Sequence, residues 1–96
     1  MEEEEIWRNI YYYDYQVSSF GNVRRLGCTK LRKLSISTNG NIGVVLSKKN
    51  VSKHFSVCKL VASAFIPNPE KLKYVKHIDG NNSNNNVSNL RWSDKK

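Results

Sequence analysis

The feature that most constrains the fold is the Asn39-Gly40 pair, which stands between two short apolar runs. Both residue types tolerate a positive φ, so an Asn-Gly pair in this setting predicts the turn of a β-hairpin. Strand-like runs lie on both sides of the pair, at 31–36 and 42–46. A polar turn at 48–50 leads into a third run at 54–57. The sequence therefore predicts a β-meander with basic side chains on its turns.

Residues 6–26 are rich in aromatic and β-branched side chains, which favour strands and aromatic-packed turns over helices. Tyr15 and Val17 flank a polar residue and predict a half-buried strand. Residues 20–22 form a predicted turn, and residues 23–26 a predicted returning strand. We expect most of the five tyrosines, and both tryptophans, to pack in the core rather than against bases.

One short helix is predicted at 58–66, where apolar residues recur at helical spacing and Pro67 and Pro69 end the pattern. A strand is predicted at 74–78. Residues 79–86 contain no apolar side chain and predict a structured loop whose side chains bond their own backbone. The final buried positions are expected to be Val87, Leu90 and Trp92.

The charge of the chain points to a polyanionic partner. The net charge is +8, yet four of the eight acids form the run Glu2–Glu5, so residues 6–96 carry 16 basic and 4 acidic residues, a net +12. Such a charge favours nucleic acid through phosphate neutralisation, although it also suits a basic protein with no nucleic-acid role. No long apolar run or amphipathic basic helix suggests a membrane partner.

The two cysteines, Cys28 and Cys58, are isolated from each other. Their spacing predicts neither a zinc site nor a disulfide framework. The N-terminus is acidic and does not resemble a signal peptide. We therefore expect an intracellular protein with reduced thiols, in a cytoplasmic, nucleoid or viral context, that is not secreted.

The most informative segment is YVKHIDGN at 74–81, followed by an Asn-Asn pair and by SNLRW at 88–92. It resembles the HNH motif of homing endonucleases. Upstream, CKLVA and AFIPNP within 58–69 are similar to the helix that precedes that motif, and residues 6–24 resemble a NUMOD-type module. The resemblance covers nearly the whole chain apart from the acidic start and roughly 27–38.

The resemblance implies an α+β fold, a small β-rich domain leading into a C-terminally truncated ββα-metal unit. It predicts an acidic tail at 1–5, a NUMOD-like DNA-binding module at 6–50 and an HNH-like unit at 51–96, within one compact domain. It further implies a nuclease in which His77 is the general base, Asn89 orients its imidazole, and a divalent cation, Mg²⁺ or Mn²⁺, stabilises charge on the phosphate. Asp79 would be the metal ligand.

Departures from the family pattern predict that cleavage is impaired or absent, in which case no cofactor is needed. The first family histidine falls at Cys58, and the residue before the predicted base is Lys76, whose ammonium would repel a cation. The chain also stops at Lys96, before a further family ligand. Without a metal, His77 would be a structural histidine, Asp79 a turn residue and Asn89 a brace of the loop.

His54 is expected at the surface, and Cys58 as a small buried hydrophobe. Double-stranded DNA is the predicted partner, with a protein partner as an alternative. The residues expected to contact phosphates are Arg24, Arg25, Lys30, Arg32, Lys33, Lys48, Lys49, Lys53 and Lys59.

Three functions remain open from the sequence. The first is a DNA-binding relative of HNH homing endonucleases with impaired cleavage. The second is an active metal-dependent endonuclease or nickase that uses His77. The third is a structural or interaction protein recruited from such a nuclease, with Glu2–Glu5 either as an adaptor or as a solvated tail.

Overall fold

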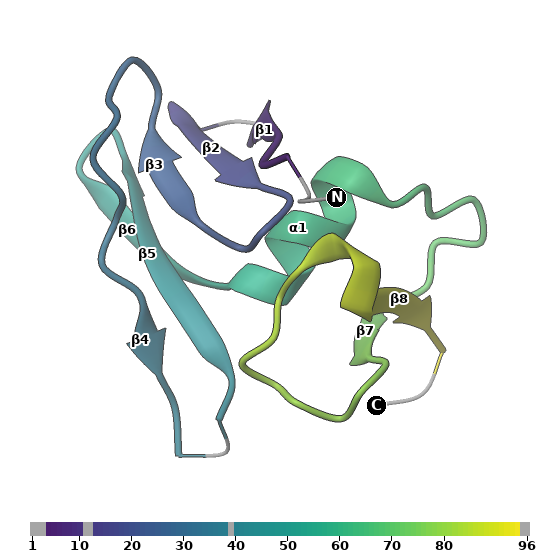
Figure 1. The fold of residues 1–96 in the computed structure, drawn as a ribbon. Helices are drawn as coiled ribbons and strands as arrows, with labels where there is room; N and C mark the ends of the chain where they lie inside the picture. Colours follow the sequence, from purple (N-terminus) through teal and green to yellow (C-terminus); the bar gives the residue numbers. More distant parts are fainter. Residues whose placement is uncertain (1–3, 11–12, 39, 95–96) are drawn as a thin grey trace.

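A computed structural model describes residues 4–10, 13–38 and 40–94. Three small antiparallel sheets surround one helix (Figure 1), which confirms the predicted α+β class. Several predictions fall outside the described residues, namely those on Glu2, Glu3, Tyr11, Tyr12, Asn39 and Lys96. No helix in the described part of the chain has the length and apolar character needed to cross a bilayer.

The first sheet contains β1 (Trp7–Asn9), β2 (Tyr15–Ser18) and β3 (Val23–Arg25), in that order. The predicted turn and returning strand are confirmed. Val17 and Val23 are cross-strand partners with no exposed surface, so they anchor the sheet on the core. The hydroxyl of Ser18 accepts hydrogen bonds from the backbone N–H groups of residues 20 and 22, which stabilises the turn between β2 and β3.

The second sheet is the predicted meander, with β4 (Ser35–Ile36), β5 (Ile42–Lys48) and β6 (Val51–Ser56) in sequence order. The strand predicted at 31–36 is shorter, because Leu31 forms an isolated bridge with Arg24 of the first sheet and only the last two residues pair with β5. β6 begins at residue 51 rather than 54, because a two-residue turn joins it to β5. Both turn residues have positive φ, Lys49 at 50° and Asn50 at 65°. This is the backbone that a primed hairpin turn requires. The predicted module boundary at residue 50 therefore lies inside a hairpin.

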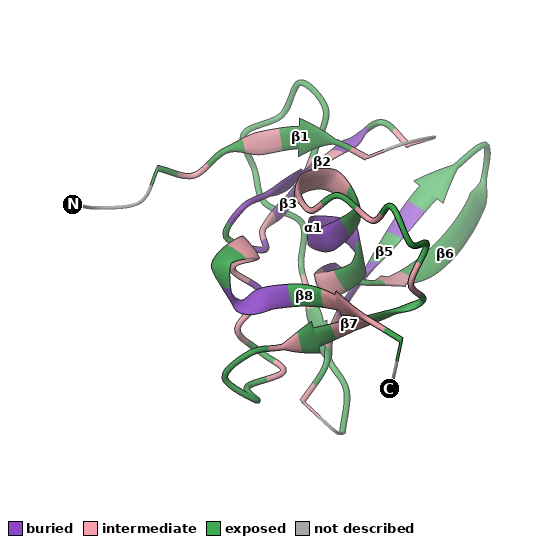
Figure 2. Ribbon diagram, turned by 90° about the vertical axis from the view of Figure 1, so that its right-hand side faces the viewer, coloured by how far each residue is buried: buried purple, intermediate pink, exposed green. Residues whose placement is uncertain are grey.

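The helix α1 (Val57–Phe65) is one residue earlier at both ends than predicted. The backbone N–H of Ile66 still bonds to the carbonyl of Ala62, and the chain turns away before Pro67. Val57, Val61 and Ala62 have no exposed surface. The helix contacts strands of all three sheets, and Figure 2 shows its buried side at the centre of the molecule.

The third sheet pairs β7 (Tyr74–His77) with β8 (Leu90–Ser93), and a 3₁₀ turn, η1 (Val87–Asn89), leads into β8. The predicted strand before the Asn-rich segment and the loop itself are confirmed. Inside the loop, the amide oxygens of Asn81, Asn84 and Asn86 each accept a hydrogen bond from a backbone N–H two residues later. These are the local side-chain bonds that the composition predicted.

The core is assembled from all three sheets and the helix. It consists of Tyr15, Val17, Val23, Val44, Leu46, Val57, Leu60, Val61 and Leu90.

The aromatic residues depart in part from the core prediction. Tyr15 is buried and Tyr13 packs edge-on against Phe55 at 5.3 Å, but Tyr74 is exposed. Trp7 and Trp92 are half-buried rather than fully buried. The indole N–H of Trp92 donates to the carbonyl of residue 66, so this ring ties β8 to the end of α1.

Candidate active site and nucleic-acid interface

His77 ends β7, opposite Leu90, and its side chain is half-buried. Its Nε2 lies 2.7 Å from Oδ1 of Asn85 in the Asn-rich loop. An amide oxygen can only accept a hydrogen bond, so the proton lies on Nε2. In the neutral imidazole the lone pair is then on Nδ1, and this nitrogen is the one able to take a proton.

Asn85 is itself packed against the first sheet. Only 5% of its surface is exposed, and its backbone and Cβ lie against Gly21 in the turn between β2 and β3. The backbone N–H of Val87 donates to the carbonyl of Ser19 at 2.8 Å, which fixes the same contact. The orientation of the His77 ring therefore depends on a turn almost sixty residues earlier in the chain.

The prediction that Asn89 hydrogen-bonds the His77 ring is wrong. The side-chain oxygen of Asn89 accepts from the backbone N–H of Asp79, and its amide nitrogen donates to the Asp79 carboxylate and to the carbonyl of Asn84. Asn89 is buried and braces the loop, which is the alternative role considered above. The ring is held instead by Asn85, which belongs to the Asn-Asn pair of the motif.

Asp79 is exposed, and hydrogen-bond donors surround its carboxylate. The backbone N–H of Asn81 donates to Oδ1 at 2.8 Å, and the side-chain amide of Asn84 donates to Oδ2 at 3.0 Å. The backbone bond from Asn81, followed by the side-chain bonds from Asn84 and Asn89, lowers the pKa of Asp79 below its ordinary value. These are the contacts of a turn-forming residue.

The residues around His77 do not fit a divalent cation. Both carboxylate oxygens of Asp79 are engaged by N–H groups, and the amide oxygen of Asn85 is bonded to the imidazole. Lys76 brings a positive charge next to His77 in the chain. Within residues 4–10, 13–38 and 40–94, no group of three histidine, cysteine or acidic side chains could hold a metal.

Cys58, which was expected at the position of the first family histidine, is half-buried on α1 and packs against the core. Burial raises the pKa of its thiol. This environment suits the small hydrophobe predicted from the sequence and disfavours the thiolate that a metal would need. His54 is exposed as predicted, and its ring lies over Gly43 on the neighbouring strand.

Lys76 and Arg91 face each other across the two strands of the third sheet. Both side chains are exposed, and together with His77 and Ile78 they line a hollow of about 310 Å³. Arg91 was not among the predicted contacts, although it stands within the SNLRW motif. Only the strand register places it opposite the residue before His77.

Three arginines are held against aromatic rings. The guanidinium of Arg24 lies 4.0 Å from the centre of the Trp7 ring and donates to Gln16. Arg32 lies 5.5 Å from the Tyr15 ring. Arg8, which the sequence interpretation missed, lies 5.0 Å from the Phe65 ring. Such stacking limits the rotamers of the side chain and leaves its outer edge available to an anion.

The other predicted phosphate contacts are all exposed, but they form separate groups. Arg25 joins Lys48 and Lys49 around a polar hollow of about 460 Å³ at the β5–β6 hairpin. Arg32 and Lys33 line a second hollow of about 300 Å³. Lys30 and Lys53 line none of the hollows named for residues 4–10, 13–38 and 40–94.

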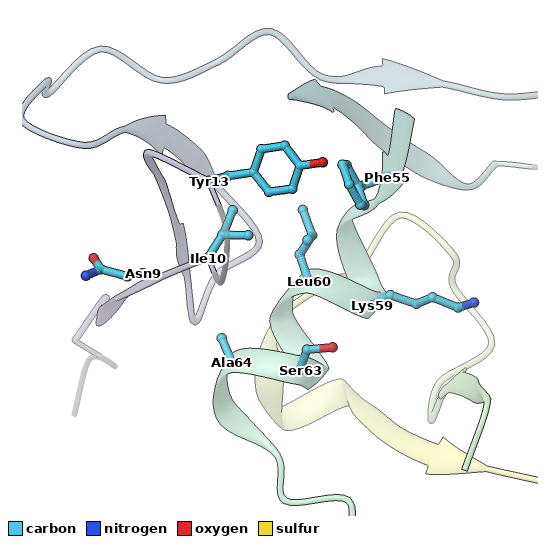
Figure 3. Close-up of a pocket in the computed structure, with 8 residues that line it drawn as sticks. All are labelled: Asn9, Ile10, Tyr13, Phe55, Lys59, Leu60, Ser63 and Ala64. Carbon is cyan, nitrogen blue, oxygen red and sulfur yellow. The ribbon is translucent and has the colours of Figure 1, made fainter. Parts of the chain in front are cut away.

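Lys59 lies instead at an apolar pocket of about 410 Å³ between the end of β1 and α1 (Figure 3). Ile10, Tyr13, Phe55 and Leu60 provide its apolar wall. Neither His77 nor the residues that support it line this pocket.

Two family models match the chain. One, described as HNH endonuclease, matches residues 60–96, and the other, described as the NUMOD4 motif, matches residues 5–47. Uncharacterized HNH endonuclease L245 of Acanthamoeba polyphaga mimivirus is 44% identical over 91 residues, which are 94% of this chain and 27% of that protein. DNA endonuclease I-HmuI of Bacillus phage SP01 is 39% identical over 88 residues, 90% of this chain and 51% of that protein.

A solved structure shows the same architecture. It is that of the HNH homing endonuclease I-HmuI, from work on its DNA binding and cleavage, and it matches with a TM-score of 0.83 and 38% identity. The match covers 92% of this chain and 52% of the other. The chain thus spans between about a quarter and about half of the length of the relatives it matches.

Proposed function

The chain belongs to the family of HNH homing endonucleases and combines a NUMOD4 motif with an HNH motif; from this premise we propose that it binds double-stranded DNA and that its cleavage activity is impaired. The observation that carries the proposal is the donor set around His77, which presents a lysine and oxygens already bonded to N–H groups where a cation would have to bind.

Binding to duplex DNA is supported by the arrangement of the basic side chains. Arg25, Lys48 and Lys49 converge at one hairpin, while Arg24 is held in place on an indole ring. Basic residues on turns and strand edges contact phosphates and set the position of a protein on the duplex. The affinity should therefore fall steeply as salt rises. An intracellular setting that contains DNA is part of this proposal.

Impaired cleavage is supported by the engagement of each candidate oxygen ligand. Asp79 accepts three hydrogen bonds, two at Oδ1 and one at Oδ2, and its pKa is lowered by them. A cation at Asp79 would have to share both carboxylate oxygens with these N–H groups and also approach the ammonium of Lys76. Proteins usually offer Mg²⁺ one or two carboxylates, and this chain uses the carboxylate of Asp79 to hold the loop.

An active endonuclease is the second candidate, because one observation favours it. The bond from His77 to Asn85 fixes the ring and leaves Nδ1 as the basic nitrogen. An oriented neutral imidazole is the arrangement expected of a general base. On this candidate, a ligand set different from the family pattern would serve Mg²⁺ or Mn²⁺.

The deciding experiment measures nicking of supercoiled plasmid with EDTA, Mg²⁺ or Mn²⁺, beside a gel shift on the same DNA at two salt concentrations. The proposal predicts salt-sensitive binding without nicking. Metal-dependent nicking that disappears in His77→Ala would establish the second candidate instead. His54→Ala is the matched control, since this histidine is exposed on a different sheet.

The recruited structural or interaction protein is the third candidate. Indifference to duplex DNA at low salt, together with stoichiometric co-purification of one protein, would replace DNA binding with this role. Deletion of residues 1–5 then tests whether the acidic run Glu2–Glu5 contacts that protein.

A further inference from the structure

Lys76 and Arg91 place two positive charges directly opposite each other on an exposed sheet face. Side chains at such positions have Cβ atoms roughly 4.5–5.5 Å apart, and like charges there destabilise the pairing of the strands. The first acid after Lys76, Asp79, is bonded by the amides of the loop. The electrostatic cost of this pair falls when an anion lies between the two side chains.

The surroundings of the pair suit a phosphate group. The hollow of about 310 Å³ beside it is also lined by His77 and Ile78. Arginine offers two parallel N–H donors to phosphate oxygens, and lysine adds a compact point charge. The two residues are thus chemically complementary parts of one anion site.

We propose that Lys76 and Arg91 form a phosphate-binding site that takes one backbone phosphate of duplex DNA in the hollow that His77 also lines, with the two side chains supplying the positive charge that a divalent cation would otherwise bring. The assignment of the phosphate to DNA rests on the proposed function. The site itself rests on the strand register and on the donors around His77, since no group of three histidine, cysteine or acidic side chains in the described part of the chain could hold a metal.

The first test is the salt dependence of duplex binding in Lys76→Gln, Arg91→Gln and the double variant. One neutralised phosphate contributes about 0.9 to the slope of log affinity against log salt concentration. The double variant should lower the slope by about that amount, and the two single effects on affinity should be non-additive. The control is Lys71→Gln/Lys73→Gln, which removes the same charge from exposed positions on the preceding loop and should preserve the slope.

Two results of this test would overturn the site. A slope in the double variant equal to that of the control would mean that the pair contacts no phosphate. A loss of about 1.8, with additive single effects, would mean that the two residues contact separate phosphates. In both cases the proposed DNA binding would remain intact.

The second test does not require DNA binding. Inorganic phosphate is titrated into ¹⁵N-labelled protein, and the Nε–H signal of Arg91 and the amide signal of Lys76 are followed. Saturable shifts that disappear in Lys76→Gln/Arg91→Gln would support the site, even if the intact chain failed to bind duplex DNA and the proposed function were lost. Absence of such shifts in the intact protein would overturn it.

The same labelled protein tests whether Lys76 keeps a divalent cation away from His77. Mn²⁺ should leave the imidazole signals of His77 sharp in the intact protein, because Lys76 repels it. Lys76→Asp, which introduces a carboxylate beside the ring, should make the same signals broaden. Strong broadening in the intact protein would show that a cation binds there and would overturn the proposal.

Discussion

The Cα of Gly21 lies directly against the side chain of Asn85, so close that a Cβ on the glycine would stand 2.9 Å from the Cβ of the asparagine. Gly21 belongs to the turn between β2 and β3, and Asn85 bonds the ring of His77. The first sheet therefore positions the imidazole through one buried asparagine. The two family motifs of the chain are joined at this contact.

Gly21→Ala should destabilise the fold and loosen this contact. The residue has a φ of +89°, which costs an alanine about 1–2 kcal/mol, and the overlap with Asn85 should add about 1–3 kcal/mol. Gly27→Ala is the matched control, because its φ of +84° is similar and its Cβ would meet nothing within 4 Å. Urea unfolding measures both; equal losses of stability would contradict the contact.

Asn85→Ala should release the His77 ring and leave the imidazole proton free to move between the two nitrogens. Loss of a buried partner should also cost about 1–3 kcal/mol of stability. The tautomer is measured by the ¹⁵N shifts of the ring, which should show a proton on Nε2 in the intact protein. Asn85→Asp keeps an accepting oxygen and should keep that tautomer. An unchanged ring in Asn85→Ala would show that the bond does not position it.

The Asn-rich loop should lose stability in acid through Asp79. Its pKa is lowered in the folded chain, chiefly by the backbone N–H of Asn81, so the folded state favours the carboxylate. This stabilisation is complete above the unfolded value of about 3.9 and is lost as the pH falls through the lower folded pKa. A ¹³C titration of the carboxyl group measures that value. The protection factor of the Asn81 amide against hydrogen exchange should fall in acid in the intact protein. Asp79→Asn should abolish this acid dependence of the protection factor, and its persistence would contradict the role of Asp79.

Asn50→Gly should stabilise the β5–β6 hairpin by up to about 1 kcal/mol. The residue has a φ of 65°, and glycine reaches that conformation without the steric cost that an L side chain bears. The control is Lys53→Gly on the same hairpin, where φ is not positive and glycine should cost about 0.5–1 kcal/mol through chain entropy. Thermal unfolding compares the two. A loss of stability in Asn50→Gly would argue against the primed turn.

The helix and most strands were predictable because each depends on residues that lie close together in the sequence. The three-stranded meander and the helix were predicted to within a few residues, and the Asn-rich loop bonds its own backbone as expected. His77 could be singled out because it lies inside a motif. The start of β6 was placed three residues late although the turn before it was predicted, because its first residues are exposed and include the polar Ser52 and Lys53, which carry no strand signal.

The partners of the site residues could not be predicted. Asn89 was expected at the imidazole, and Asn85 occupies that place; both are asparagines of the same motif, and only the path of the loop distinguishes them. Arg91 was missed because its importance comes from the register that sets it opposite Lys76. Arg8 was missed because its ring partner, Phe65, lies on α1, far away in the chain.

The sequence by itself determined the turns, the strands, the single helix and the family of this protein, because each depends on residues within a few positions of one another. The tertiary structure alone decided which amide holds His77, which cation faces Lys76 and which turn supports Asn85. These contacts join segments that are distant along the chain. Their geometry is set by the packing of three sheets on one buried helix, and no local pattern encodes it.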